Sequence, residues 1–195
     1  GLLKSLEAFG YHNLMGNISG NQDRARFVSY ADGSVRFDED AKAAGWTREI
    51  SIQDSTALDK MALLMAFNMT VPGIPVIYYG DEIGMPGGND PDNRRMMRFE
   101  SLTAKEVALK ETIAQLAQFR RSHMAMIFGD TRIIKAENDL FCFERSYFDQ
   151  TVTIVINNSA QARSLDFLDT ENLQANFGPG GNEIAGNSFE IFTHK

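Results

Sequence analysis

The chain has 195 residues, of which 43% are hydrophobic and 10% aromatic, and its formal net charge is −7. This length allows one or two domains with buried cores, and the acidic balance argues against a nucleic-acid or anionic-membrane partner. Cys142 is the single cysteine, so no disulfide forms within the chain, and no Cys/His metal-ligand cluster is visible. The longest apolar run, 61–67, is too short to span a bilayer.

The N-terminal half begins with alternating helix and strand patterns. Residues 1–9 have the character of the end of an amphipathic helix, and 12–16 are expected to form a short strand. A helix is predicted over 56–69, where the apolar positions have helical spacing. Its start is assigned to a capping box of Thr56 and Asp59.

A second strand and helix follow. Residues 74–80 are continuously apolar and bounded by Pro and Gly, a pattern typical of a strand covered on both faces in a parallel sheet. The segment 103–123 is predicted to be a helix that begins with the capping box of Thr103 and Glu106. The resulting βαβα order indicates an α/β domain.

The pattern changes near residue 129. Short alternating segments separated by turn residues predict antiparallel strands in a small β-sandwich. These segments are 131–135, 140–145, 151–156, 163–168 and 188–193. The sequence therefore predicts an α/β domain over 1–129 and an all-β domain over 130–195.

Two loops that follow strands, 17–24 and 80–95, combine carboxylates with arginines. A carboxylate accepts two hydroxyl hydrogen bonds and a guanidinium donates several in one plane, which suits a hydroxyl-rich ligand. Acidic, glycine-rich loops are also common as solvated connections, so composition alone leaves both interpretations open.

The literal residues of these loops are more specific. The run VPGIPVIYYGDEIGM at 71–85, followed by PGGNDPDNRR at 86–95, closely resembles the last barrel strand and following loop of the α-amylase family, glycoside hydrolase family 13. Asn21-Gln22-Asp23 occupies the place of that family's Asn-His-Asp motif. The resemblance implies that 1–129 is the C-terminal quarter of a (β/α)8 barrel, from strand 7 to helix 8. Residues 130–195 would be the family's antiparallel C-terminal domain.

The resemblance also implies roles for two residues. Asp23 matches the third catalytic carboxylate, which binds sugar hydroxyls and favours the distorted, oxocarbenium-like transition state without attacking or protonating. Gln22 matches the substrate-binding histidine. Glutamine still donates and accepts hydrogen bonds but cannot carry a proton charge, so the match implies binding and leaves out an electrostatic role.

Asp90 and Arg94 match positions that often hold the next sugar along. An internal salt bridge that shapes the loop is an equally good interpretation of two opposite charges four residues apart.

Other charged residues in these loops are interpreted structurally. Asp81 and Glu82 are expected to maintain the loop at the strand end. Arg24 and Arg26 are expected to be local ion-pair partners rather than ligands.

The aromatic residues are expected to pack rather than to bind sugar. Tyr78 and Tyr79 are assigned to the core of a buried strand. Trp46 lies in a polar insert, beside a possible short helix at 38–44, and is assigned to packing in preference to a sugar platform.

The segment with Arg36 and Asp38 is similar to the sequence around the family nucleophile. It is rejected, because the nucleophile belongs before residues 21–23 and not after them.

In the α-amylase family the nucleophile and the general acid come from strands that precede this region. The resemblance therefore implies an α-glucan-active glycosidase as the parent protein, with a maltooligosaccharide or longer α-glucan as ligand, and inactivity of residues 1–195 alone. Alternatives are a catalytically dead relative, a carbohydrate-binding or interaction module, and a transglycosylase or isomerising relative. Two strands leave unpaired edges, so the missing barrel part or a second copy is an expected partner. No cofactor is visible, and calcium in the parent would depend on other loops. A secreted or periplasmic location is only what many starch-degrading relatives show.

Overall fold

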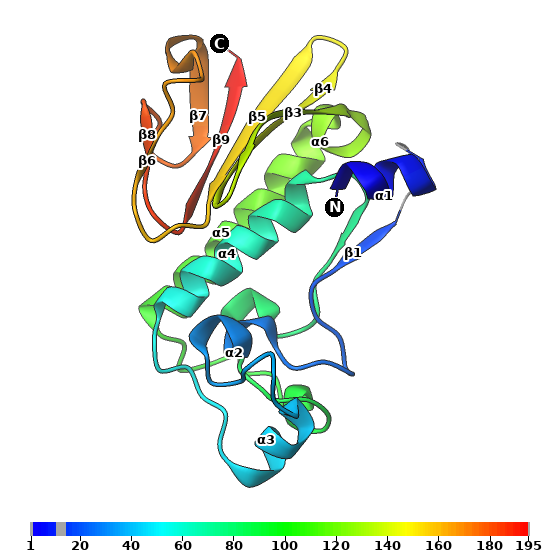
Figure 1. Cartoon of the computed structure of the whole chain (residues 1–195), viewed down its shortest axis with the longest axis vertical. Helices are drawn as coiled ribbons and strands as arrows, with labels where there is room; N and C mark the ends of the chain where they lie inside the picture. The colour runs from blue at the N-terminus through cyan, green and yellow to red at the C-terminus, as the bar shows by residue number, and fades with distance from the viewer. Residues whose placement is uncertain (1, 11–14, 195) are drawn as a thin grey trace. The chain divides into compact units, whose positions relative to one another are not determined.

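The structure, a computed structural model, describes residues 2–10 and 15–194 (Figure 1). They divide into two compact units. The sheet unit comprises Gly1–Asn17, Ala66–Pro75 and Leu116–Lys195, and the loop unit comprises Ile18–Met65 and Val76–Gln115. Among the helices described, none combines the length and the apolar character needed to cross a membrane.

Both long helices that the sequence predicts are present. The α-helices are α1 (Leu2–Phe9), α2 (Phe27–Asp32), α3 (Ala41–Thr47), α4 (Thr56–Thr70), α5 (Ala104–Ser122) and α6 (Met124–Phe128). Single 3-10 turns occur at η1 (Asp81–Ile83), η2 (Asp92–Arg94) and η3 (Thr170–Asn172). The possible helix at 38–44 is displaced to α3, because Asp40 caps it by accepting from the amides of Lys42 and Ala43. The short helix α2 was not predicted.

The starts of the two long helices differ. At α5 the predicted capping box is confirmed: the Thr103 amide donates to the Glu106 carboxylate (2.7 Å) and the Glu106 amide donates to the Thr103 hydroxyl (3.3 Å). At α4 the predicted box is wrong. Asp54 caps this helix by accepting from the amide and the hydroxyl of Thr56 (2.9 and 2.6 Å), while Asp59 pairs with Lys105.

Strands β1 (Gly16–Ile18) and β2 (Ile74–Val76) pair in a two-stranded sheet. The strand predicted at 12–16 lies largely outside the described residues. The strand predicted at 74–80 is too long, because the backbone turns where the Asp81 amide donates to the Tyr78 carbonyl (3.0 Å). The expected cover on both faces is also absent there, since Ile74 is 48% exposed.

Gly73, at the start of β2, permits the close approach of the two strands. Its φ of 110° lies in the region that favours glycine, and a Cβ there would lie 2.5 Å from the Met15 carbonyl oxygen. The Ile74 amide donates to that same carbonyl (2.8 Å). A side chain at position 73 would therefore break the pairing.

The C-terminal residues form antiparallel strands, as predicted. One sheet has the order β3-β4-β5-β9-β7, and β6 pairs with β8 in a ribbon. The strands are β3 (Asp130–Glu137), β4 (Leu140–Tyr147), β5 (Gln150–Asn157), β6 (Arg163–Ser164), β7 (Leu173–Phe177), β8 (Glu183–Ile184) and β9 (Ser188–His194). The strand predicted at 163–168 is reduced to β6. Strands β7 and β8 were not predicted, since their polar sequences hide the alternation.

The sheet has apolar layers on both faces. On one face Cys142 and Val155 pack with Leu165 and Ile184, the latter from the ribbon. Strands β4 and β5 also contact α6. Buried Arg145 donates to the Thr70 carbonyl at the end of α4 (3.2 Å), which satisfies a helix-end group that lacks an intrahelical partner.

Glu190 of β9 is a buried charge in the sheet unit. It is 1% exposed, and neither carboxylate oxygen has a hydrogen-bond partner of good geometry. Burial raises the pKa of Glu190 to about 7, against the opposing pull of the Gly180 backbone amide. Folding therefore favours the neutral acid.

We expect this glutamate to make stability depend on pH. Because the folded pKa is raised, its contribution is greatest below about pH 4.5 and is lost as the pH rises through about 7. Glu190→Gln should remove this dependence and raise the free energy of unfolding at pH 8 by about 1–3 kcal/mol. Urea titrations from pH 5 to 8 measure it, with Glu183→Gln on the exposed side of β8 as the control. Equal pH dependence in both variants would contradict the prediction.

Candidate functional site

The four residues predicted to bind substrate lie together in the loop unit. Arg94 is at the centre of this cluster. Its Nη2 lies 3.5 Å from Oδ1 of Asp23, and its Nε lies 3.1 Å from Oδ1 of Asp90 and donates to the Gln22 carbonyl (3.2 Å). Two loops separated by about seventy residues in sequence therefore meet at one guanidinium. We call Gln22, Asp23, Asp90 and Arg94 the polar cluster.

The polar cluster is open to solvent. The side chain of Asp23 is 69% exposed, that of Arg94 is 46% exposed and that of Asp90 is 35% exposed. The Gln22 amide donates to Oδ2 of Asp23 (2.9 Å), and the Asp23 backbone amide donates to the Asn21 side chain (2.9 Å). The carboxylate is thus oriented but accessible, and it can accept hydroxyl hydrogen bonds while Gln22 and Arg94 donate others.

The salt bridge proposed between Asp90 and Arg94 is present, and Lys42 lies 3.7 Å from the other oxygen of Asp90. This pairing fixes the direction of the Arg94 side chain. Both side chains can still form hydrogen bonds with a ligand, because both remain partly exposed.

Asn93, which the sequence did not single out, holds the two loops together. It is fully buried, and its side-chain amide donates to the carbonyls of Asn21 (3.2 Å) and Arg24 (2.7 Å). Its neighbour Arg94 points instead to the polar cluster. The signal in the sequence was weak, because one asparagine among several polar loop residues has no distinctive spacing.

Arg26 is the second buried link. Its guanidinium forms an ion pair with Asp81 (3.1 Å) and donates to the carbonyls of Tyr79 (2.6 Å) and Asn93 (3.0 Å). It also lies over the Tyr78 ring, 4.1 Å from the centroid. Arg26 does form an ion pair, but the prediction of a local partner is wrong, because Asp81 lies 55 residues away in the sequence.

Asp81 and Glu82 maintain the loop, as predicted. Asp81 is buried, and burial raises its pKa to about 6 despite the attraction of Arg26. Glu82 accepts from the Gly80 amide (2.7 Å), at the turn that leaves β2.

Two predictions about aromatic residues are wrong. Tyr78 is half-buried and Tyr79 is exposed, because β2 ends before them. Trp46 on α3 is 70% exposed and therefore is not a packing anchor. Arg36 and Asp38 form an exposed salt bridge (2.9 Å), which agrees with their rejection as a nucleophile motif.

Comparisons with known proteins identify the class. No protein-family model matches the chain. It is 30% identical over 160 residues to a cyclomaltodextrinase of Thermoanaerobacter pseudethanolicus, covering 82% of this chain and 24% of that protein. It is 37% identical over 100 residues to a cyclomaltodextrin glucanotransferase of Bacillus sp. strain 38-2, covering 51% and 14%. Its fold matches a solved Anoxybacillus α-amylase with a TM-score of 0.71 and 25% identity, over 98% of this chain and 40% of that one.

A pair of strands with their helices, followed by an antiparallel β-domain, is thus the last part of a (β/α)8 barrel and the domain that follows it. The chain belongs to the α-amylase family, glycoside hydrolase family 13, and corresponds to its C-terminal region. It comprises the C-terminal quarter of a (β/α)8 barrel and a small antiparallel β-sandwich. The chain spans 24% or less of the length of the curated relatives named above.

The buried ion pair should matter more than exposed ones. Arg26→Met leaves the Asp81 carboxylate and two carbonyls without their donor, so we expect a loss of about 3–5 kcal/mol in the free energy of unfolding. Arg36→Met removes the exposed Arg–Asp pair and should leave the free energy of unfolding almost unchanged, because solvent screens this pair. Urea denaturation of both variants is the measurement. The double variant Arg26→Met/Asp81→Leu should lose less than the sum of its single variants, and strict additivity would argue against a coupled pair.

Proposed function

We propose that the protein containing this chain is a retaining glycoside hydrolase that cleaves α-1,4-glucosidic bonds in α-glucans. Residues 1–195 would supply the sugar-binding side of its active site. The observation that carries the proposal is the convergence of Gln22, Asp23, Asp90 and Arg94 from two distant loops. The relatives named cyclomaltodextrinase and α-amylase support the substrate class.

Asp23 is proposed to stabilise the transition state. Cleavage of a glycosidic bond develops positive charge on the sugar ring, and a carboxylate that is already oriented stabilises this charge without reorganising. Gln22 and Arg94 hold the carboxylate from two sides. When a sugar binds, its hydroxyls can replace these contacts at little cost, because exposed ion pairs contribute about 1 kcal/mol or less.

Gln22, Asp90 and Arg94 are proposed to bind sugar hydroxyls. The half-exposed pair of Asp90 and Arg94 offers an acceptor and donors 3.1 Å apart. Such adjacent groups match neighbouring hydroxyls on one sugar ring.

The bond-breaking residues are proposed to come from other parts of the protein. Retaining glycosidases need a nucleophile and an acid whose carboxyl groups lie about 5–5.5 Å apart. The family resemblance assigns both to strands that precede the matched region. We further propose that the barrel part ends at residue 129, one residue before β3 begins.

The proposed partner of this chain is the remaining part of the barrel or, failing that, a second copy. Strands β1 and β2 pair only with each other in the part of the chain that the structure describes. Ile18 and Ile74 on these strands are exposed. Pairing of the open edges with further strands would cover both side chains.

Glucan transfer is a second candidate activity. The similarity to a cyclomaltodextrin glucanotransferase favours it, and the proposed roles of the polar cluster are the same for hydrolysis and transfer. Product analysis on maltooligosaccharides separates the two, because transfer yields longer or cyclic chains.

We expect Asp23→Asn to reduce kcat of the whole protein by roughly 10²–10³-fold, the effect of removing one preorganised transition-state group. Asp90→Asn should mainly raise KM, because it removes a sugar contact remote from the reacting bond. Steady-state hydrolysis of maltohexaose measures both. A full rate in Asp23→Asn would remove Asp23 from the catalytic machinery.

Residues 1–195 alone should release no reducing sugar from starch or maltooligosaccharides. The reason is the proposed location of the nucleophile and the acid. A sensitive reducing-end assay of the purified chain tests this expectation, with the whole protein as the positive control. Turnover by the chain alone would contradict the proposal that the nucleophile and the acid lie in other parts of the protein.

A further inference from the structure

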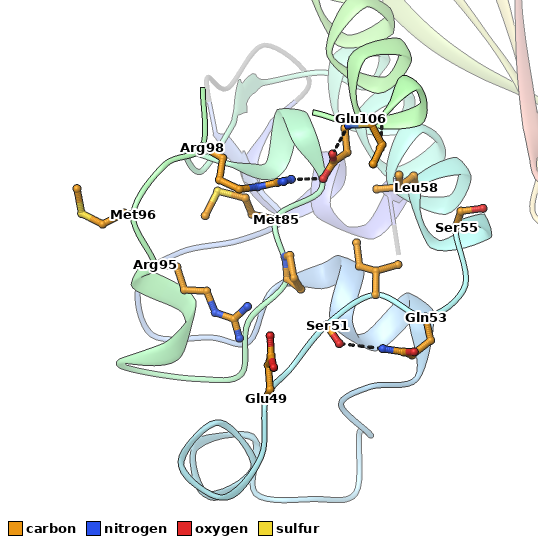
Figure 2. Close-up of a pocket in the computed structure, with 13 residues that line it drawn as sticks. Glu49, Ser51, Gln53, Ser55, Leu58, Met85, Arg95, Met96, Arg98 and Glu106 are labelled. Carbon is orange, nitrogen blue, oxygen red and sulfur yellow. Dashed lines mark hydrogen bonds and ion pairs between the residues drawn. The ribbon is translucent and has the colours of Figure 1, made fainter. Parts of the chain in front are cut away.

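The loop unit also contains a cavity, which is distinct from the polar cluster. It has a volume of about 450 Å³, within the range of small-ligand sites. Three segments line it: 49–58 at the start of α4, 85–98 after η1, and the beginning of α5 (Figure 2). None of the four residues of the polar cluster lines this cavity.

Polar groups converge on one side of the cavity. Glu49 has no hydrogen bond or ion pair to any residue that the structure describes, and Figure 2 shows its side chain directed toward the same space as that of Arg95. Arg95 is fixed by two contacts to Asp92 (2.8 and 2.9 Å). Gln53 donates to the Ser51 hydroxyl (2.8 Å), which leaves the Gln53 carbonyl oxygen as an acceptor.

An apolar wall, next to the ion pair of Arg98 and Glu106, forms another part of the lining (Figure 2). Leu58 and Met85 are buried side chains of this wall, and Met96 is 90% exposed at the rim. A ligand with one apolar face and several hydroxyls would bury the former against the wall and direct the latter to Glu49, Ser51 and Arg95.

The charges of the lining are balanced. Two carboxylates, Glu49 and Glu106, face two guanidiniums, Arg95 and Arg98, and Glu106 is ion-paired with Arg98. A strongly anionic ligand would meet Glu49, and a cation would meet Arg95. An uncharged polyol is therefore the ligand class that fits.

We propose that this cavity is a second α-glucan site that binds a short maltooligosaccharide independently of the polar cluster. The identity of the sugar depends on the proposed function, whereas the existence of a site for an uncharged, hydroxyl-rich ligand depends only on the cavity. A bound chain would place one ring on the Leu58 and Met85 wall. Its hydroxyls would bridge the carboxylate of Glu49 and the guanidinium of Arg95.

The test uses the whole protein with methyl-labelled methionine and maltotriose as the probe. The methyl signals of Met85 and Met96 should shift on titration, while that of Met126, buried in the sheet unit, should not. Glu49→Ala should raise the maltotriose concentration at half of the full shift about tenfold or more, because it removes a charged acceptor. Glu111→Ala, at an exposed position of α5 outside the cavity, is the matched control and should titrate like the wild type.

A second background separates this inference from the proposed function. In Asp23→Asn the Met85 and Met96 response should persist, because Asp23 does not line the cavity. A protein that hydrolyses maltohexaose but shows no shift at Met85 and Met96 would overturn the second site and leave the proposed function standing. A shift that disappears in Asp23→Asn and survives in Glu49→Ala would also overturn it. A shift in a protein without hydrolysis would support the cavity and contradict the proposed function.

Discussion

The loop unit depends on one buried guanidinium. Arg26 contacts Asp81, Tyr79 and Asn93 within 3.1 Å, and these residues belong to two segments more than fifty positions away. A guanidinium taken out of water is costly unless its donors are satisfied, so the loops that satisfy Arg26 are held where they meet. The exposed residues nearby inherit their positions from this contact, because Asp23 precedes Arg26 by three residues and Arg94 follows Asn93 directly.

The buried and the exposed polar residues of these loops have different roles. Asn93 is fully buried and joins backbones, whereas Arg94 is half-exposed and meets Asp23 at 3.5 Å. Breaking a contact of the first kind costs much free energy, because it leaves buried polar groups unpaired, whereas breaking one of the second kind costs little. The proposed exchange of internal contacts for sugar hydroxyls would use this combination: a fixed backbone, and side chains that lose little free energy when they change partners.

The sequence predicted what local chemistry specifies. Helix α5 was predictable because Thr103 and Glu106 form a capping box at the right spacing, and the strands after residue 129 because they alternate. The cap of α4 was missed because Asp54, two residues earlier, competes better for the Thr56 amide. Residues 77–80 have strand composition but no strand, since pairing partners are not encoded locally. The polar cluster was found through literal motif similarity, whereas Asn93 and the distant partner of Arg26 follow from tertiary contacts that no spacing reveals.

One short segment, Asp90 to Arg95, orients side chains toward both the polar cluster and the cavity. Its two aspartates each hold a different arginine: Asp90 holds Arg94 at 3.1 Å, and Asp92 holds Arg95 at 2.8 Å. Two consecutive arginines repel each other, and without partners their side chains would adopt many orientations. The paired aspartates keep the two guanidiniums apart and fix the direction of each. Asp92 is itself constrained. The Gly88 amide donates to its carboxylate (2.6 Å), and Gly45 of α3 approaches so closely that a Cβ on it would lie 2.7 Å from the Cβ of Asp92. The tight contact with α3 thus fixes Arg95 without touching Arg94, so the two adjacent guanidiniums are oriented by different acids.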